Sequence, residues 1–212
     1  MTENVADTVP RPRIESLSDL VFGLALSVGA LSLLSKLPSN PAEVRSDIVA
    51  FAFSFLILTF VWLSYTRAMS VLPIETRATL VLNITMLFLV AIEPYLFYLV
   101  SLFGHTGEYH VVDYASVMYA LDMGGLMAIL AFFYHQLSVE ERRLIPQKLI
   151  AQHKRIRNVL FISAGLFFLT VFPQFWSWQI DSVPLRLYLW LSPMAIAWIS
   201  RGLAPNQTSA KG

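Results

Sequence analysis

Residues 78–102 read ATLVLNITMLFLVAIEPYLFYLVSL, and Glu93 is the only Asp, Glu, Lys or Arg among them. A helix rises 1.5 Å per residue and the hydrocarbon core of a bilayer is about 30 Å thick, so about 20 apolar residues cross it. The apolar residues here do not alternate with polar ones, which excludes a barrel strand. The segment therefore predicts a transmembrane helix.

The rest of the chain has the same character. Hydrophobic residues make up 56% and charged residues 14% of the 212 residues, and the mean hydropathy is +0.61. A soluble domain has about 25% charged residues, so this composition excludes a disordered chain and argues strongly against a soluble enzyme. The formal net charge of +1 predicts no nucleic-acid partner. The absence of cysteine excludes disulfides and thiolate metal sites.

Six stretches are apolar enough to cross a membrane, so we predict an all-α membrane protein with six transmembrane helices. They cover residues 17–34, 48–65, 78–102, 114–137, 158–178 and 185–200. We expect one transmembrane domain over residues 13–201, with disordered cytoplasmic tails at 1–12 and 202–212.

The basic residues of the connectors predict the orientation. If the chain crosses an even number of times, twelve of the 15 Lys and Arg lie on the side of the N-terminus, and Lys36, Arg45 and Arg186 lie on the other. The positive-inside rule then places both termini in the cytoplasm.

The first predicted helix carries a stripe of branched side chains. Leu24, Val28 and Leu31 recur at i, i+4 and i+7, which places them on one face. Asp19 lies about 140° around the helix from Leu24 and cannot share that face. It also argues against a cleaved signal peptide, because it interrupts the apolar run. Taken alone, such a stripe is typical of packing between membrane helices.

Glu93 and Asp122 fall inside predicted spans. Ionisable groups at such positions are costly and usually face the interior of the bundle or water. Their position is consistent both with structural pairing inside the bundle and with a role in transport. Protonation would remove most of the cost of burial.

Three patterns together resemble the transmembrane protein 175 family of potassium channels, in its short prokaryotic six-helix form. They are Arg13-x-x-x-Leu17-Ser18-Asp19, then Trp62-Leu63-Ser64-Tyr65-Thr66-Arg67, and then Asn83 eleven residues before Pro94. The family signature is R-x-x-x-F-S-D, so leucine replaces phenylalanine at residue 17. Tyr65 and Thr66 stand where histidines are expected, so we expect part of the family's polar network to be missing.

The resemblance implies a homotetramer in the prokaryotic plasma membrane, in which each subunit gives its first helix to a central pore. It implies K⁺ as the permeating ion, lipid and identical subunits as partners, and no enzyme activity, cofactor or other metal. It places the pore constriction at rings of Leu24, Val28 and Leu31. We further expect the Ser27 hydroxyl to lie near this constriction. It assigns a network that positions the first helix to Arg13, Ser18, Asp19 and Trp62.

A narrow ring of leucines blocks ions by excluding water, and widening it admits both. For a gate of this kind we expect only modest selectivity for potassium over sodium. The alternative is a proton-coupled carrier that uses Glu93 and Asp122. A membrane enzyme is disfavoured, because the four histidines are scattered and lack metal-ligand spacing.

Overall fold

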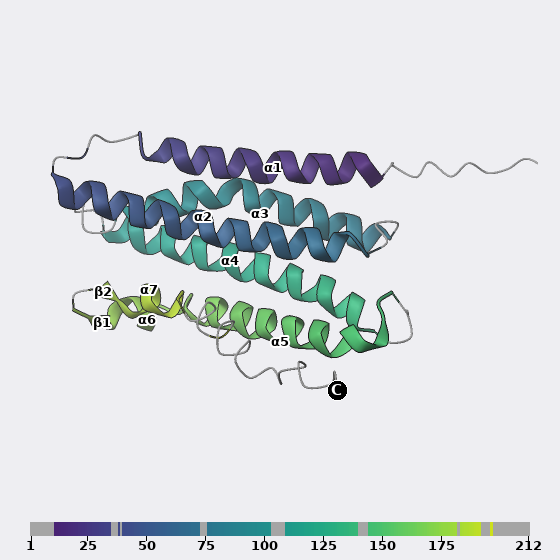
Figure 1. Ribbon diagram of the computed structural model, residues 1–212. Coiled ribbons are helices and arrows are strands. Elements are labelled where there is room, and N and C mark those ends of the chain that lie inside the picture. Colours follow the sequence, from purple (N-terminus) through teal and green to yellow (C-terminus); the bar gives the residue numbers. More distant parts are fainter. Residues whose placement is uncertain are drawn as a thin grey trace, which may run out of the picture.

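Five long helices follow one another along the chain and reverse direction at each connection (Figure 1). The computed structural model describes residues 11–34, 38, 40–72, 76–102, 109–139, 144–181, 183–191 and 196. The long helices are α1 (Arg11–Ser32), α2 (Pro41–Met69), α3 (Arg77–Ser101), α4 (Tyr109–Ser138) and α5 (Gln147–Leu169). The described part of the chain is thus mostly helical, as predicted, although it also contains a short hairpin. The two predicted tails lie outside the described residues, apart from positions 11 and 12.

Three of these helices are long and apolar enough to cross a membrane: Pro41–Met69, Arg77–Ser101 and His110–Ser138. A shorter apolar helix covers Ser16–Leu31. The first four predicted spans match α1 to α4, although the helices start up to seven residues earlier than the apolar runs. Local signals explain two of these starts. The Asn40 side chain caps α2 by accepting bonds from two backbone N–H groups, and the Thr76 hydroxyl caps α3 by accepting one from Thr79.

The fifth and sixth predicted spans need correction. Helix α5 begins at Gln147, eleven residues before the predicted start, and ends at Leu169 rather than at 178. Its early turns include the basic residues expected in a connector. After it, the described chain forms α6 (Gln174–Ser177), a hairpin of β1 (Gln179–Ile180) and β2 (Val183–Pro184), and α7 (Leu185–Leu189). Most of the predicted sixth span beyond residue 191 lies outside the described residues.

Helix α4 forms the centre of the bundle, between α3 on one side and α5 on the other (Figure 1). Adjacent glycines allow both neighbours to come close. A Cβ added at Gly124 would lie 2.7 Å from the ring of Phe168 on α5, and one at Gly125 would lie 3.0 Å from Leu89 on α3. Helix α1 lies at the edge of the bundle and packs chiefly on α3.

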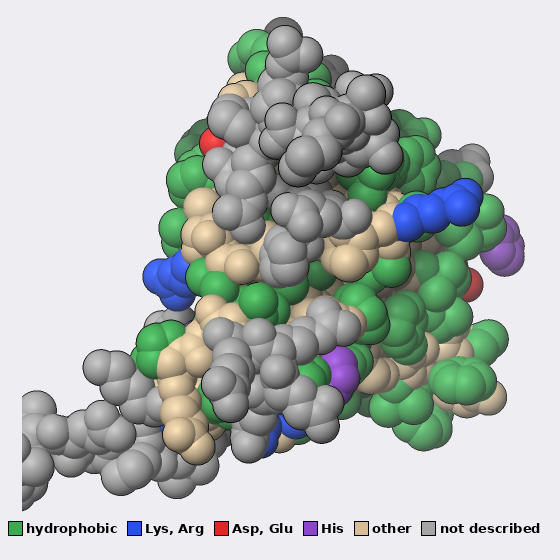
Figure 2. Space-filling view, turned by 90° about the vertical axis from the view of Figure 1, so that its right-hand side faces the viewer, with side chains coloured by type: hydrophobic (Ala, Val, Ile, Leu, Met, Phe, Trp, Pro, Cys, Tyr) green, Lys and Arg blue, Asp and Glu red, His purple; other side chains and the backbone are tan. Residues whose placement is uncertain are grey.

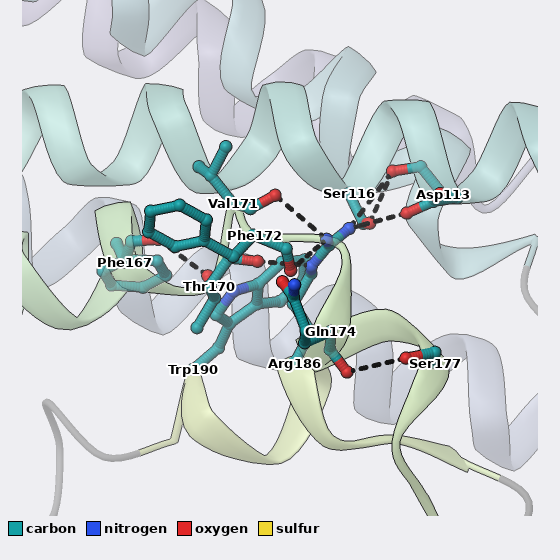
Figure 3. Close-up of polar contacts among 10 residues, drawn as sticks. All are labelled: Asp113, Ser116, Phe167, Thr170, Val171, Phe172, Gln174, Ser177, Arg186 and Trp190. Atoms are coloured by element: carbon teal, nitrogen blue, oxygen red, sulfur yellow. Dashed lines mark hydrogen bonds and ion pairs between the residues drawn. The ribbon is translucent and has the colours of Figure 1, made fainter.

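One buried arginine fastens the C-terminal segment to the bundle (Figure 3). Arg186 of α7 donates to Asp113 Oδ1 at 2.8 Å and to Ser116 Oγ at 2.6 Å, both on α4. Its Nε donates to the carbonyl of Thr170 at 2.6 Å, and Nη2 reaches the next two carbonyls at 3.3 Å. These carbonyls follow the end of α5, where a helix leaves acceptors without partners and its dipole favours a cation.

The burial of Arg186 corrects one sequence-based assumption, because this residue was counted as a basic group in a connector. It is fully buried and ion-paired. Figure 2 shows the opposite end of the bundle, where α1 begins and α4 ends: Lys and Arg side chains lie at its edges, and hydrophobic side chains cover much of the adjoining flank.

Candidate functional site

Helix α1 has one face that is buried against the bundle and one face that is exposed. Ser18, Phe22 and Ala25 recur at i, i+4 and i+7 and are all buried against the bundle. Further along the same face, a Cβ at Gly29 would lie 3.8 Å from the ring of Phe51 and 3.9 Å from Pro94. One face of α1 is therefore held by α2 and α3.

The other face presents the three predicted ring residues. Leu24 is 63%, Val28 43% and Leu31 61% exposed in the single chain. The same face continues in both directions with Leu17, Leu20 and Leu34, which are also exposed. A continuous row of exposed branched side chains is a surface that lipid, another subunit or a pore would meet.

A chain of hydrogen bonds ties the start of α1 to α2 and α3. The hydroxyls of Ser18 and Tyr65 are 2.7 Å apart and share a hydrogen bond. Tyr65 in turn donates to Asn83 Oδ1 at 2.7 Å. All three residues are buried, and the Tyr65 ring also lies 5.7 Å from that of Phe22. Because a buried polar group without a partner is costly, this chain fixes how α1 sits on the bundle.

A second contact, also a hydrogen bond, lies beside the Ser18–Tyr65–Asn83 chain at the surface of the bundle. The indole N–H of Trp62 donates to Asp19 Oδ1 at 2.9 Å, so these two predicted network residues are in direct contact. Ser27 is exposed and donates to the carbonyl of Gly23 at 2.8 Å, within its own helix. Arg13 lies in α1, but its side chain is outside the described residues.

Tyr65 is the member of this site that the sequence reasoning missed. It was noted only as a departure from the histidine expected at this position, with loss of contacts as the consequence. In the structure its hydroxyl reaches both Ser18 and Asn83. Its position on the same face as Val61 and Ala68, both buried, was the available signal that residue 65 points into the bundle.

Glu93 and Asp122 lie elsewhere, inside the bundle. Glu93 on α3 accepts from the Ser54 hydroxyl on α2 at 3.0 Å to one oxygen and 3.2 Å to the other. Asp122 on α4 is also buried, and neither of its oxygens has a hydrogen-bond partner within the described residues. These two acids are thus in the interior of one subunit and not on the exposed face of α1.

Three apolar helices of spanning length, with a shorter apolar helix packed at the edge, define a multi-pass helical membrane protein. The family model described as "Endosomal/lysosomal potassium channel TMEM175" matches residues 13–94, which run from the start of α1 to Pro94 of α3. The predicted resemblance to this family is therefore confirmed.

Two solved structures share the fold. One is a variant of the potassium channel MtTMEM175 in complex with a nanobody fusion protein, 17% identical, with a TM-score of 0.62 over 96% of this chain and 97% of that one. The other is a lysosomal potassium-selective channel TMEM175 homologue from Chamaesiphon minutus, 18% identical, with a TM-score of 0.59 over 90% and 97%. No curated protein matches the sequence.

Proposed function

We propose that this chain is a subunit of a passive potassium channel of modest selectivity, in which identical subunits place α1 around a central pore. The observation that carries the proposal is the two-faced α1. One face is fixed to α2 and α3 by packing and by the Ser18–Tyr65–Asn83 bonds, while the other presents Leu24, Val28 and Leu31 to its surroundings. The match of the potassium channel family model to residues 13–94 supports the same function.

The mechanism follows from the chemistry of those side chains. Rings of Leu24, Val28 and Leu31 around an axis would exclude water from the narrowest part of the path, and ions cannot cross without water or ligands. A small rotation or tilt of α1 would widen the rings and admit both. The Ser27 hydroxyl lies at the edge of this face, and its oxygen would be available to a passing ion.

The polar contacts at the start of α1 would set its resting position. Ser18 and Asp19 hold two sides of the helix to α2, through Tyr65 and Trp62 respectively. Arg13 is proposed to extend this network. We propose four subunits, both termini in the cytoplasm and residence in the prokaryotic plasma membrane, because these properties accompany the family resemblance and the bias of basic residues.

Flux into liposomes tests the proposal. Purified protein should carry K⁺ down its gradient without saturation and should favour K⁺ over Na⁺. Leu24→Asn should raise the flux by wetting the ring, and Leu24→Ala should do so by removing its bulk. Leu63→Ala, at an exposed leucine of α2, is the matched control. If both Leu24 variants conduct like the parent while the protein remains assembled, Leu24 does not form the constriction.

A proton-coupled carrier is the second candidate, and the burial of Glu93 and Asp122 without a basic partner among the described residues favours it. A carrier would saturate with substrate, and its flux would be lost in Glu93→Gln or Asp122→Asn. Channel flux should survive both substitutions at constant pH.

A further inference from the structure

The interior between α2, α3 and α4 holds an unusual group of polar side chains. Glu93 accepts a hydrogen bond from the Ser54 hydroxyl, whose single proton can bond only one carboxylate oxygen at a time, and the buried Tyr119 hydroxyl lies close to the same carboxyl group. Both oxygens of Asp122 are buried and have no hydrogen-bond partner within the described residues. Native interiors rarely leave several polar atoms without partners at one place, so this group calls for a ligand.

These groups act on one another. The carboxyl groups of Glu93 and Asp122 are close enough to repel each other when both are charged, and Tyr119 interacts electrostatically with both. Tyr119 and Asp122 are three residues apart on α4, on neighbouring turns. The Tyr119 ring is covered by Trp190, with ring centres 4.7 Å apart.

Among the described residues, neither carboxyl group pairs with a Lys, Arg or His side chain. The guanidinium of Arg186, on α7, is bonded to Asp113 and Ser116 of α4. Ser116 precedes Asp122 by six residues, about 9 Å along the helix.

The elements packed around the group add no other charge from the described residues. Besides Ser54, α2 contributes the phenol of Tyr65, which is bonded to Asn83 ten residues before Glu93. The buried face of α5 carries hydrophobic and hydroxyl side chains, and the described acid of α1, Asp19, is exposed and bonded to Trp62.

Two neighbouring carboxylates without a cation are strongly disfavoured in such an interior, because each loses its hydration and repels the other. A neutral carboxylic acid avoids both costs and also gains an O–H donor for a nearby acceptor. We propose that Glu93, Asp122 and Tyr119 form a proton-binding site inside each subunit, which keeps both carboxyl groups neutral in the folded protein. The site lies apart from the exposed face of α1.

The proposal gives stability a defined dependence on pH. The folded protein holds protons that the unfolded chain releases above about pH 4, the ordinary range for free carboxyl groups. A state that binds more protons is stabilised by low pH, so stability must fall as pH rises until the buried pair itself loses a proton.

Melting of the purified full-length protein in detergent tests this. Between about pH 5 and about pH 9, the melting temperature of the parent should fall by at least about 3 °C more than that of the double variant Glu93→Gln/Asp122→Asn. Gln and Asn imitate the neutral acids and cannot titrate. Asp47→Asn, at a partly exposed position near the start of α2, should keep the parental slope. Equal slopes for the parent and the double variant would overturn the proposal.

Infrared spectroscopy of the parent protein serves if the double variant does not fold. A neutral carboxylic acid has a carbonyl band that a carboxylate lacks. The parent should show this band at neutral pH, and the single variants Glu93→Gln and Asp122→Asn should each reduce it. Its absence from the parent, or its persistence unchanged in both variants, would overturn the proposal. The proposal would also be overturned if K⁺ stabilised the parent at high pH and did not stabilise the variants, because the site would then bind a metal cation.

The site also lies next to the contact between α3 and the helix proposed to line the pore. Pro94 follows Glu93 directly and faces Gly29, which is located between Val28 and Leu31 on α1. A charge at Glu93 would therefore disturb α3 where α1 rests on it. This consequence rests on the proposed function: K⁺ flux should depend on pH in the parent and less so in the double variant. Melting and infrared spectra do not require conduction, so they report on the proton site even if the protein is not a channel.

Discussion

Helices α1 and α4 are both rich in leucine and small residues, yet the bundle uses them in opposite ways. Helix α4 is buried on most sides, and its paired glycines let α3 and α5 approach closely. Helix α1 buries one narrow face and exposes the other along its length. A single chain therefore covers α4 on most sides but leaves one side of α1 exposed, and the proposed pore would use that side. The substitutions below test this difference between the two helices.

The largest loss of stability is expected from Arg186→Met. It removes the guanidinium that bonds Asp113, Ser116 and the carbonyls at the end of α5, so these groups lose their partner in a buried site. Breaking a buried ion pair in this way costs about 3–5 kcal/mol. Unfolding in mixed micelles measures the loss. Arg45→Met, at an exposed position of α2, is the control, and an equal small effect for both would mean that Arg186 does not hold the C-terminal segment.

The contrast between the two helices is tested directly by the same substitution in each. Leu130→Ala removes a fully buried side chain of α4 and should lower the free energy of unfolding by about 2–5 kcal/mol. Leu24→Ala on α1 should change it by less than about 0.5 kcal/mol, because its side chain is mostly exposed. The same unfolding assay applies. Equal losses would show that the exposed face of α1 packs as tightly as the interior.

A smaller effect is expected at the bonds that anchor α1. Tyr65→Phe keeps the ring against Phe22 but leaves Asn83 and Ser18 without the hydroxyl, at a cost of about 1–3 kcal/mol. Tyr188→Phe, at an exposed tyrosine, should cost little. Hydrogen exchange at the start of α1 should rise in Tyr65→Phe and not in the control. Unchanged exchange would mean that packing alone holds α1.

The smallest effect is expected at the surface bond between Trp62 and Asp19. A double-mutant cycle with Trp62→Phe and Asp19→Ala should give a coupling free energy of about 0.5–1 kcal/mol, since Asp19 is exposed to solvent. A coupling larger than that of the buried Tyr65 bonds would reverse the proposed ranking of the two contacts.

The sequence predicted the helical membrane fold and the first four helices well, because long apolar runs leave few alternatives. It placed Leu24 and Asp19 on different faces of α1 by helical periodicity alone. It misplaced the ends of α5, because charged residues such as Lys154 and Arg157 continue a helix at a membrane surface although they end an apolar run. The short hairpin after α6 has two residues per strand and no periodic signal.

The candidate site likewise has features that the sequence predicted and features that it did not. The spacing of Leu24, Val28 and Leu31 placed them on one face of α1, but their exposure is known only from the structure. The place of Tyr65 between Ser18 and Asn83 could not be predicted, since these residues are far apart in the chain. Arg186 looked like an ordinary basic residue of a connector, because burial depends on neighbours that the local sequence does not contain.

Hydropathy and the 3.6-residue repeat were enough to predict membrane helices and to place Leu24, Val28 and Leu31 on one face of α1. The partners of the polar groups became known from the packing of the helices: Tyr65 with Ser18 and Asn83, Arg186 with the end of α5, and Glu93 with Ser54. Hydrophobic burial has no direction and can be read from composition, whereas a hydrogen bond requires two atoms about 3 Å apart, a distance set by how whole helices pack.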